Sequence, residues 1–158
     1  MDSNLARETT ALMSEARLVA IALGYDYIST IHLLLADCKN ERPHSIKNFI
    51  FETSDAFRQF YDSQRIEKPA LLNSVIIDSL PITLELEHTI DLAQKTYPKN
   101  ILPYHLFLAA SVLEETLLYS LLEPKEGLHE RLLNYYSQKG ITINRKTSGS
   151  FLQRLISK

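Results

Sequence analysis

Apolar residues recur every three or four positions along much of the chain, which is the spacing of an amphipathic helix. The first such stripe lies in residues 4–23 and comprises Leu5, Leu12, Met13, Ala16, Val19, Ala20 and Leu23. Gly24 follows directly, and glycine is favoured just after a helix because it tolerates a left-handed backbone. The pattern therefore predicts one long helix that ends before Gly24.

Three shorter helices are predicted to follow. Thr30 is a suitable N-cap for a helix over residues 31–38, because its hydroxyl can accept a hydrogen bond from a free backbone N–H. Pro43 is expected in the first turn of the next helix, and Ser54 is a suitable N-cap for the fourth. The side chains expected to face inward in the last two helices are Ile46, Phe49, Ile50, Phe57, Phe60 and Tyr61.

Residues 66–82 interrupt the helical pattern. Proline, asparagine, serine and aspartate residues separate the apolar residues of this stretch. We therefore expect an ordered linker that lays apolar side chains on the core.

The helical pattern restarts after Thr83, which is another suitable N-cap. Glu85 and Glu87 fall in the first turn of the predicted helix, where the helix dipole favours negative charge. The residues of this helix that are expected to face inward are Leu84, Leu86, Ile90 and Ala93.

Three more helices are expected over residues 104–111, 114–122 and 127–138. Pro103 is expected to open the first of them, and Gly140 to stop the last. The leucines of the middle helix are all expected in the core, namely Leu117, Leu118, Leu121 and Leu122.

The second set of helices repeats the first. His32-Leu33-Leu34-Leu35-Ala36 returns 73 residues later as His105-Leu106-Phe107-Leu108-Ala109. The sequence thus predicts an all-α fold of two pseudo-symmetric four-helix repeats, over residues 1–65 and 83–140, that pack as one compact domain. Residues 141–158 are left as a C-terminal tail.

Composition agrees with a helical protein and excludes several functions. The 158 residues include 26 Leu and 14 Ile but three Val and four Gly, a balance that favours helices over sheets. The chain has neither a Walker A loop nor a G-x-G-x-x-G motif, so no nucleotide cofactor is expected. There is no signal-peptide pattern and no apolar run of about 20 residues. With its single Cys38, the chain is expected to be cytoplasmic and without a membrane span.

Two segments carry a resemblance to a known family. Residues 14–36 read SEARLVAIALGYDYISTIHLLLA, and the second copy contains Leu80-Pro81-Ile82-Thr83 and, over residues 101–109, ILPYHLFLA. In these residues the chain resembles the Clp N-terminal domain, the double four-helix repeat at the front of Clp-type AAA+ unfoldases such as ClpA, ClpC and ClpB. The resemblance covers about residues 3–138 and implies a module that receives substrate or adaptor proteins for an ATPase ring.

The chain departs from the family pattern before each repeated histidine. The family often carries glutamate there, and in ClpC-like members these acids help to receive phosphorylated arginine. Here Ile31 and Tyr104 stand at these positions, and neither pairs with a guanidinium as a carboxylate does. The resemblance then implies binding through an apolar groove between the repeats, with Tyr25, Tyr27, Ile31 and Tyr104 as the candidate residues. Alternatively, the tyrosines fill the junction between the repeats.

The second copy also has a shorter first helix. Ala93 lies 12 residues before His105, whereas Ala16 lies 16 residues before His32. The difference of four residues is about one helical turn. The helix after Thr83 is therefore expected to be about a turn shorter than the first helix of the chain.

The repeated histidines could be a catalytic or metal-binding pair, or could cap the helices that they begin. No cluster of cysteine or acidic residues accompanies His32 or His105 at ligand spacing, so we interpret both as structural and expect no metal. The other histidines, His44, His88 and His129, are expected on solvated faces. There is no G-x-S-x-G motif, and Cys38 is expected to be packed, so no catalytic role is predicted.

The formal net charge of −2 conceals an uneven distribution. Residues 1–138 carry 12 basic and 19 acidic side chains, a net of −7, whereas residues 139–158 carry five basic and no acidic ones. The acidic body argues against a nucleic-acid partner. The basic tail is either a solvated terminus or an arm that docks on an acidic partner or an anionic surface, with Phe151, Leu152, Leu155 and Ile156 as apolar anchors.

These observations predict a non-catalytic protein-binding module of the Clp chaperone and protease system. Its expected partners are substrate or adaptor proteins and a Clp-family ATPase. The alternative is the N-terminal part of a larger Clp-family unfoldase or disaggregase, or of a sheath-recycling ATPase of type VI secretion. An independent enzyme is a third interpretation, against which the missing catalytic motifs argue.

Overall fold

The computed structural model describes residues 5–39, 44–64 and 80–145. Within these ranges the chain is helical, which confirms the predicted all-α class. The helices are α1 (Arg7–Ala22), α2 (Thr30–Lys39), α3 (Lys47–Thr53), α4 (Asp55–Gln64), α6 (Leu84–Thr96), α7 (Pro103–Ala110), α8 (Leu117–Leu121) and α9 (Leu128–Gln138). None of them combines the length and the apolar character that a membrane span requires.

Some sequence predictions fall on residues that are not described. Most of the predicted linker, residues 66–82, lies outside the described residues, as does the part of the predicted tail after residue 145. Pro43, the predicted first-turn residue of the third helix, also lies outside them.

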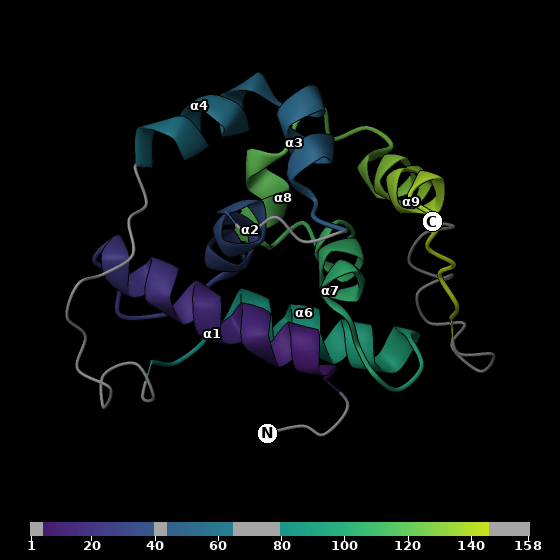
Figure 1. Ribbon diagram of the computed structural model, residues 1–158, viewed down its shortest axis with the longest axis horizontal. Coiled ribbons are helices and arrows are strands. Elements are labelled where there is room, and N and C mark those ends of the chain that lie inside the picture. Colours follow the sequence, from purple (N-terminus) through teal and green to yellow (C-terminus); the bar gives the residue numbers. More distant parts are fainter. Residues whose placement is uncertain (1–4, 40–43, 65–79, 146–158) are drawn as a thin grey trace.

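Two short helices lie at the centre of the molecule. Figure 1 shows α1 and α6 along one side, α3 and α4 on the opposite side and α9 at one end, with α2, α7 and α8 between them. α2 packs against α1 and α8, and α7 packs against α1, α6 and α9. Eight of the 10 residues of α2 and six of the eight of α7 are buried. The apolar runs in their middle parts, residues 33–36 and 106–110, are therefore explained by neighbours on several sides.

Two short parallel pairings join the segments that precede the helices. Leu5, ahead of α1, pairs with Ile101, ahead of α7. Ile28, ahead of α2, pairs with Ile82, ahead of α6. In the first pairing the Ala6 N–H donates to the Ile101 carbonyl over 2.9 Å. Each pairing thus holds a helix start of the first half beside a helix start of the second half.

Most predicted helix ends are confirmed. Gly24 follows α1 with φ +85°, and Gly140 follows α9 with the same φ. The Ser54 hydroxyl accepts the Phe57 N–H over 3.2 Å at the start of α4, and Thr83 caps α6. α6 has 13 residues and α1 has 16, so α6 is about one turn shorter, as the histidine spacing predicted.

Two predictions about apolar positions are wrong. Leu84 was expected to face inward but is 65% exposed. The buried stripe of α6 begins at Leu86, and residues two apart lie about 200° apart around a helix, so Leu84 faces away from the core. The helix predicted over residues 114–122 is shorter, since α8 begins after the N-cap Thr116, whose hydroxyl accepts the Tyr119 N–H over 3.1 Å. In this short helix Leu118 is buried but Leu117 is 42% exposed.

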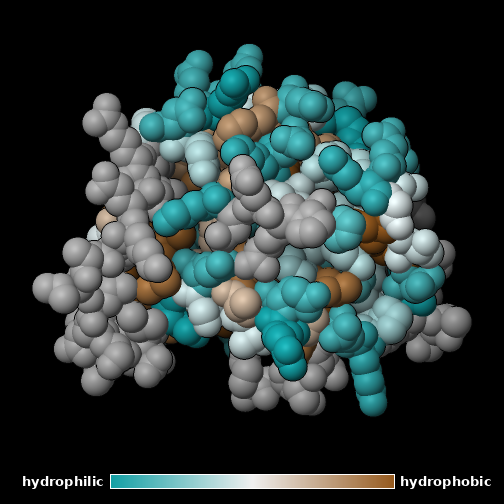
Figure 2. All heavy atoms as spheres, viewed as in Figure 1, coloured by the Kyte–Doolittle hydropathy of each residue, from teal (hydrophilic) through white to brown (hydrophobic). Residues whose placement is uncertain are grey.

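The surface is polar with small apolar areas. The face seen in Figure 2 carries mostly hydrophilic residues, and apolar residues reach it only in small separate areas. The large apolar side chains that are most exposed in the described residues are Leu84, Tyr25, Leu117 and Ile82. Two of them, Tyr25 and Leu117, lie at the same pocket.

Candidate functional site

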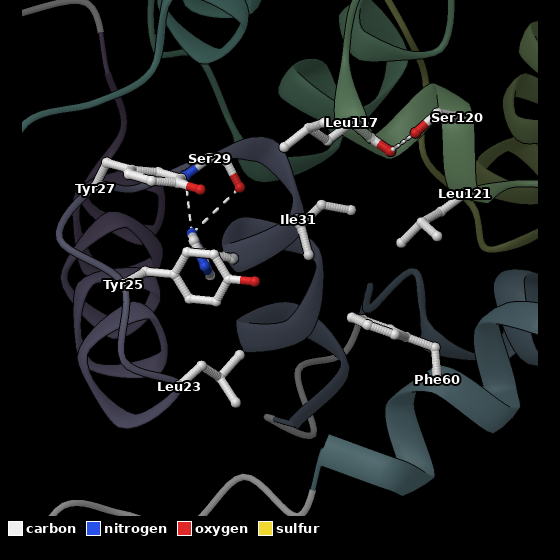
Figure 3. A pocket seen from close by; sticks show the side chains of 10 residues that line it. Leu23, Tyr25, Tyr27, Ser29, Ile31, Phe60, Leu117, Ser120 and Leu121 are labelled. Atoms are coloured by element: carbon white, nitrogen blue, oxygen red, sulfur yellow. Dashed lines mark hydrogen bonds between the residues drawn. The ribbon is translucent and has the colours of Figure 1, made fainter.

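An apolar pocket of about 260 Å³ opens between α2, α4, α8 and the connection from α1 to α2. Its lining comprises Leu23, Tyr25, Tyr27, Ser29, Ile31, His32, Phe60, Leu117, Ser120 and Leu121. Figure 3 shows Ile31, Phe60 and Leu121 on one side of this pocket, with Leu23 and Tyr25 across from them. Because α8 comes from the second half of the chain, the pocket exists only when the two halves pack together.

The connection from α1 to α2 forms an aromatic wall. The ring of Tyr25 meets the rings of Tyr27 and His32 edge to face, at centroid distances of 5.3 and 4.9 Å. The Ser29 N–H donates to His32 Nδ1 over 2.9 Å, so the imidazole satisfies a backbone donor at the start of α2. The histidine therefore fixes the connection against its own helix, and the tyrosines pack on that histidine.

His32 is a neutral part of the wall. Burial lowers the pKa of its imidazole to about 4, and the nearby Glu85 carboxylate offsets this only in part. The Ser29 hydroxyl lies 3.2 Å from His32 Nδ1. The lone pair of Nδ1 is already used by the Ser29 N–H, so this nitrogen is not available as a base toward the hydroxyl.

Glu85 connects the starts of three helices beside the pocket. From the first turn of α6, its carboxylate accepts the Thr30 N–H over 2.8 Å and the Thr30 hydroxyl over 2.6 Å. It also accepts the Leu117 N–H of α8 over 3.1 Å. The prediction that the Thr30 hydroxyl accepts an N–H at the start of its own helix is wrong: it donates to Glu85 and accepts the Leu118 N–H of α8 over 3.0 Å. Ile31 directly follows Thr30 in the chain, and Leu117 supplies one of the N–H groups that Glu85 accepts. Both residues line the pocket.

Lys125 holds the other end of α8. Its Nζ donates to the carbonyls of Tyr119 and Leu122 over 2.9 and 2.8 Å and to the Glu123 carboxylate over 2.8 Å. A cation at this position satisfies carbonyls that the helix leaves without partners and opposes the negative end of its dipole. Both ends of α8 are therefore fixed, and with them the pocket residues Leu117 and Leu121.

The structure brings together three of the four predicted binding residues. Tyr25, Tyr27 and Ile31 line the pocket, whereas Tyr104 is not part of its lining. The Tyr104 ring packs on His105 and Tyr136, at centroid distances of 4.7 and 5.4 Å. Tyr104 therefore belongs to an aromatic cluster of the second half.

His105 is placed at the start of α7 as His32 is at the start of α2. Its Nδ1 accepts the Leu102 N–H over 3.0 Å. Its ring stacks on Tyr97 at a centroid distance of 4.4 Å, and burial lowers its pKa to about 4.

The sequence interpretation missed the contribution of Phe60, Leu117 and Leu121 to the pocket. All three were assigned to the core, but Phe60 and Leu121 are only partly buried and Leu117 is exposed. A signal was present in the leucines of α8. Leu117 and Leu121 are four residues apart and share one face of a helix, while Leu118 and Leu122 share another. The two pairs are about 100° apart around the helix, so a helix at the edge of the core can bury one pair more deeply than the other.

A second, more polar pocket of about 240 Å³ lies at the start of α9 and includes Ser111, Lys125 and His129. The prediction that His129 is solvated is wrong, because it is 8% exposed and its Nδ1 lies 2.7 Å from the Ser111 hydroxyl. Burial and the charge of Arg145 lower the pKa of His129 to about 4. In the described ranges, no three His, Cys, Asp or Glu side chains are grouped as metal ligands.

Comparisons with models of protein families, with curated proteins and with solved structures find no match for this chain.

Proposed function

We propose that the chain is a non-catalytic protein-binding module of the Clp N-terminal type, whose apolar pocket takes an apolar side chain of a substrate or adaptor protein. The observation that carries the proposal is the pocket of about 260 Å³, at which Tyr25 and Leu117 remain 44% and 42% exposed. Apolar concave sites with a few polar groups favour ligand binding, and tyrosine is enriched at protein interfaces.

Three features support the repeat arrangement on which the resemblance rests. Each half begins with its longest helix, α1 or α6, and continues with a buried short helix, α2 or α7. In both short helices a histidine accepts the N–H of the residue three positions before it. The two backbone pairings also correspond, because each joins the start of a long helix to the start of the other half's short helix.

The neutral and fixed groups of the pocket favour binding over chemistry. His32 has its Nδ1 lone pair used by a backbone N–H, and the Ser120 hydroxyl donates to the Leu117 carbonyl over 2.7 Å. Apart from Ser29, the remaining lining is aliphatic or aromatic. Such a surface gains free energy mainly by removing apolar area from water, about 25 cal/mol per Å².

The test is the binding of a permanently unfolded protein, reduced and carboxymethylated, to wild type and to two leucine variants. Leu117→Ala removes a pocket side chain and is expected to weaken binding about tenfold, the equivalent of about 1.4 kcal/mol. Leu84→Ala removes an exposed leucine that does not line the pocket, and its affinity is expected to match that of wild type. Circular dichroism checks that both variants remain folded.

The proposal fails if wild type shows no binding to the unfolded protein. Equal affinities of wild type, Leu117→Ala and Leu84→Ala would also contradict it, because binding would then take place away from the pocket.

A further inference from the structure

We infer that the pocket recognises an extended protein segment through two contacts: an apolar side chain of the partner, and one backbone carbonyl of the partner that accepts a hydrogen bond from His32 Nε2–H. The inference rests on the proposed function and adds to it the polar contact and the conformation of the partner. It is carried by a nitrogen atom of His32 that the described part of the fold does not use.

The hydrogen bond that His32 accepts fixes the position of its proton. The Ser29 N–H donates to Nδ1 over 2.9 Å, so the lone pair of Nδ1 faces this donor, and a neutral ring then carries its proton on Nε2 (Figure 3). Burial lowers the pKa of His32 to about 4, so the ring is neutral at pH 7. The imidazole therefore has one N–H donor, at Nε2.

This donor is left without an acceptor. In the described part of the chain, both side-chain hydrogen bonds of His32 are at Nδ1, although the residue is only 2% exposed. His129 Nε2 also lacks a partner there but is sealed from solvent, whereas His32 Nε2 is not among the sealed atoms. Because His32 lines the pocket, a ligand in the pocket can reach this N–H.

The aromatic wall does not supply an equivalent acceptor. The ring of Tyr25 meets His32 edge to face at a centroid distance of 4.9 Å, and an N–H contact with a ring face is weaker than a hydrogen bond to a carbonyl. A ligand that fills the pocket without an acceptor removes the N–H from water and leaves it unpaired, which costs about 1–3 kcal/mol. The pocket therefore favours ligands that bring an acceptor oxygen.

The nearby charge favours a neutral acceptor. Against the effect of burial, the Glu85 carboxylate raises the pKa of His32, so its negative charge acts on the ring and disfavours an anionic ligand there. A backbone carbonyl is a neutral acceptor that every protein segment carries. In the middle of a helix, however, each carbonyl is already bonded to the N–H four residues further on. The partner that matches the pocket is therefore an extended segment.

The experiment replaces single backbone oxygens of a short peptide with sulfur, which is a weak hydrogen-bond acceptor. The parent peptide has a central Leu-Phe pair, and three thioamide peptides carry sulfur at the residue before the leucine, at the leucine or at the phenylalanine. Isothermal titration calorimetry gives the Kd of each peptide for the full chain. We expect one thioamide peptide to bind about fivefold more weakly than the parent, which corresponds to the loss of about one hydrogen bond, and the other two to bind like the parent.

Two asparagine variants test whether His32 is the donor. In His32→Asn the amide oxygen can still accept the Ser29 N–H, but the side chain is too short to place a donor at Nε2, so the parent and thioamide peptides are expected to bind alike. His105→Asn is the matched control, because His105 Nδ1 accepts the Leu102 N–H over 3.0 Å but His105 does not line the pocket. It is expected to keep the fivefold difference. The same difference in His32→Asn would overturn the inference, since the carbonyl would then bind another donor.

A measurement on wild type does not depend on how the variants fold. NMR of the chain with isotope-labelled histidine follows the Nε2–H of His32 directly. The parent peptide at saturation is expected to shift this signal and to slow the exchange of its proton with water. An unchanged Nε2–H signal at saturation would overturn the inference.

The outcomes separate the two proposals. Equal affinity of wild type for the parent and all three thioamide peptides would overturn the inference and leave the proposed function standing. Binding of a helix-stapled parent peptide as tight as that of the flexible one would do the same. Absence of binding for the parent peptide and for the unfolded protein would overturn the proposed function itself. Sedimentation that shows the chain associating with itself, together with loss of peptide binding as it does so, would assign the pocket to a second copy and overturn the inference.

Discussion

At the scale of single residues, the carboxylate of Glu85 accepts four hydrogen bonds beside the pocket. It accepts the N–H and hydroxyl of Thr30, the Leu117 N–H and the Thr83 hydroxyl, the last over 2.9 Å. Each carboxylate oxygen thus has two donors. Glu85 is therefore expected to stabilise the contact of α2, α6 and α8 rather than α6 alone.

Replacing Glu85 tests this role. Glu85→Ala leaves several donors without an acceptor and is expected to lower the free energy of unfolding by about 2–3 kcal/mol. Glu87→Ala removes an exposed first-turn glutamate of the same helix and is expected to cost less than about 0.5 kcal/mol. Urea denaturation of the three proteins measures both values. Equal losses for the two variants would show that the helix dipole, and not the network, accounts for the effect of Glu85.

The buried histidines predict a loss of stability in acid. Burial holds the pKa values of His32, His105 and His129 at about 4, below the unfolded value of 6.5. Between these two values the unfolded chain binds protons that the folded chain does not. The folded state therefore has its full stability above pH 6.5 and loses stability as the pH falls toward 4. Each histidine is expected to lower the free energy of unfolding by about 1–2 kcal/mol between pH 7 and pH 5.

Two histidine variants test whether the buried histidines cause this pH dependence. His105→Gln is expected to reduce the difference in unfolding free energy between pH 7 and pH 5. His88→Gln is the control, because His88 is exposed and its pKa is raised by the hydrogen bond that its Nδ1–H donates to the Glu115 carboxylate. If His105→Gln and wild type lose the same free energy between the two pH values, His105 is protonated normally in the folded protein and this explanation is wrong.

At the scale of elements, α8 depends on contacts from other parts of the chain. It has five residues, too few to be stable alone. Thr116, Thr30 and Glu85 accept N–H groups at its start, and Lys125 donates to carbonyls near its end. Since α8 supplies Leu117 and Leu121, the pocket depends on these contacts.

Removing the lysine tests that dependence. Lys125→Met keeps a long apolar side chain but loses the hydrogen bonds of the ammonium, and it is expected to cost about 1–2 kcal/mol and to speed amide exchange in α8. Lys95→Met removes an exposed lysine that pairs with Asp91 on α6, and it is expected to cost less than about 0.5 kcal/mol. Unchanged exchange in α8 of Lys125→Met would contradict the assigned role.

Elements set by local patterns could be predicted, and those set by distant contacts could not. The end of α1 at Gly24 and the caps Ser54 and Thr83 follow from neighbouring residues, and the structure confirms them. The role of Thr30 was missed because its partner Glu85 lies 55 positions away in the sequence. The exposure of Leu117 was missed because a leucine-rich segment gives no sign of which of its faces meets the core.

The same distinction holds for the pocket. Tyr25, Tyr27 and Ile31 were found because they lie beside the repeated histidine motif. Phe60 comes from α4 of the first half and Leu121 from α8 of the second half, and neither helix carries such a motif. Only tertiary packing brings these two residues to the first three. Tyr104 lies beside the second histidine, so the same motif predicted it as a binding residue. In the structure it packs into the aromatic cluster of its own half instead.

At the scale of the whole molecule, His32 and His105 accept equivalent backbone hydrogen bonds, but their surroundings differ at the place where binding is proposed. Beside His32 there is a pocket with Ile31 in its wall. Beside His105, the rings of Tyr97 and Tyr104 lie within 4.4 and 4.7 Å, centroid to centroid. We therefore expect one apolar segment to bind per chain, on the first-half side.

The most direct test of this account is a titration of the isotope-labelled chain with a short peptide that carries a central Leu-Phe pair, followed by amide and methyl NMR shifts. The account predicts saturable changes at Ile31, Leu117 and Leu121, one peptide per chain, and little change around Tyr97 and Tyr104. Leu84 is the internal control for an exposed leucine away from the pocket. Shifts centred on the second half, or absent at the pocket at saturating peptide, would contradict the claim that this pocket is the protein-binding site.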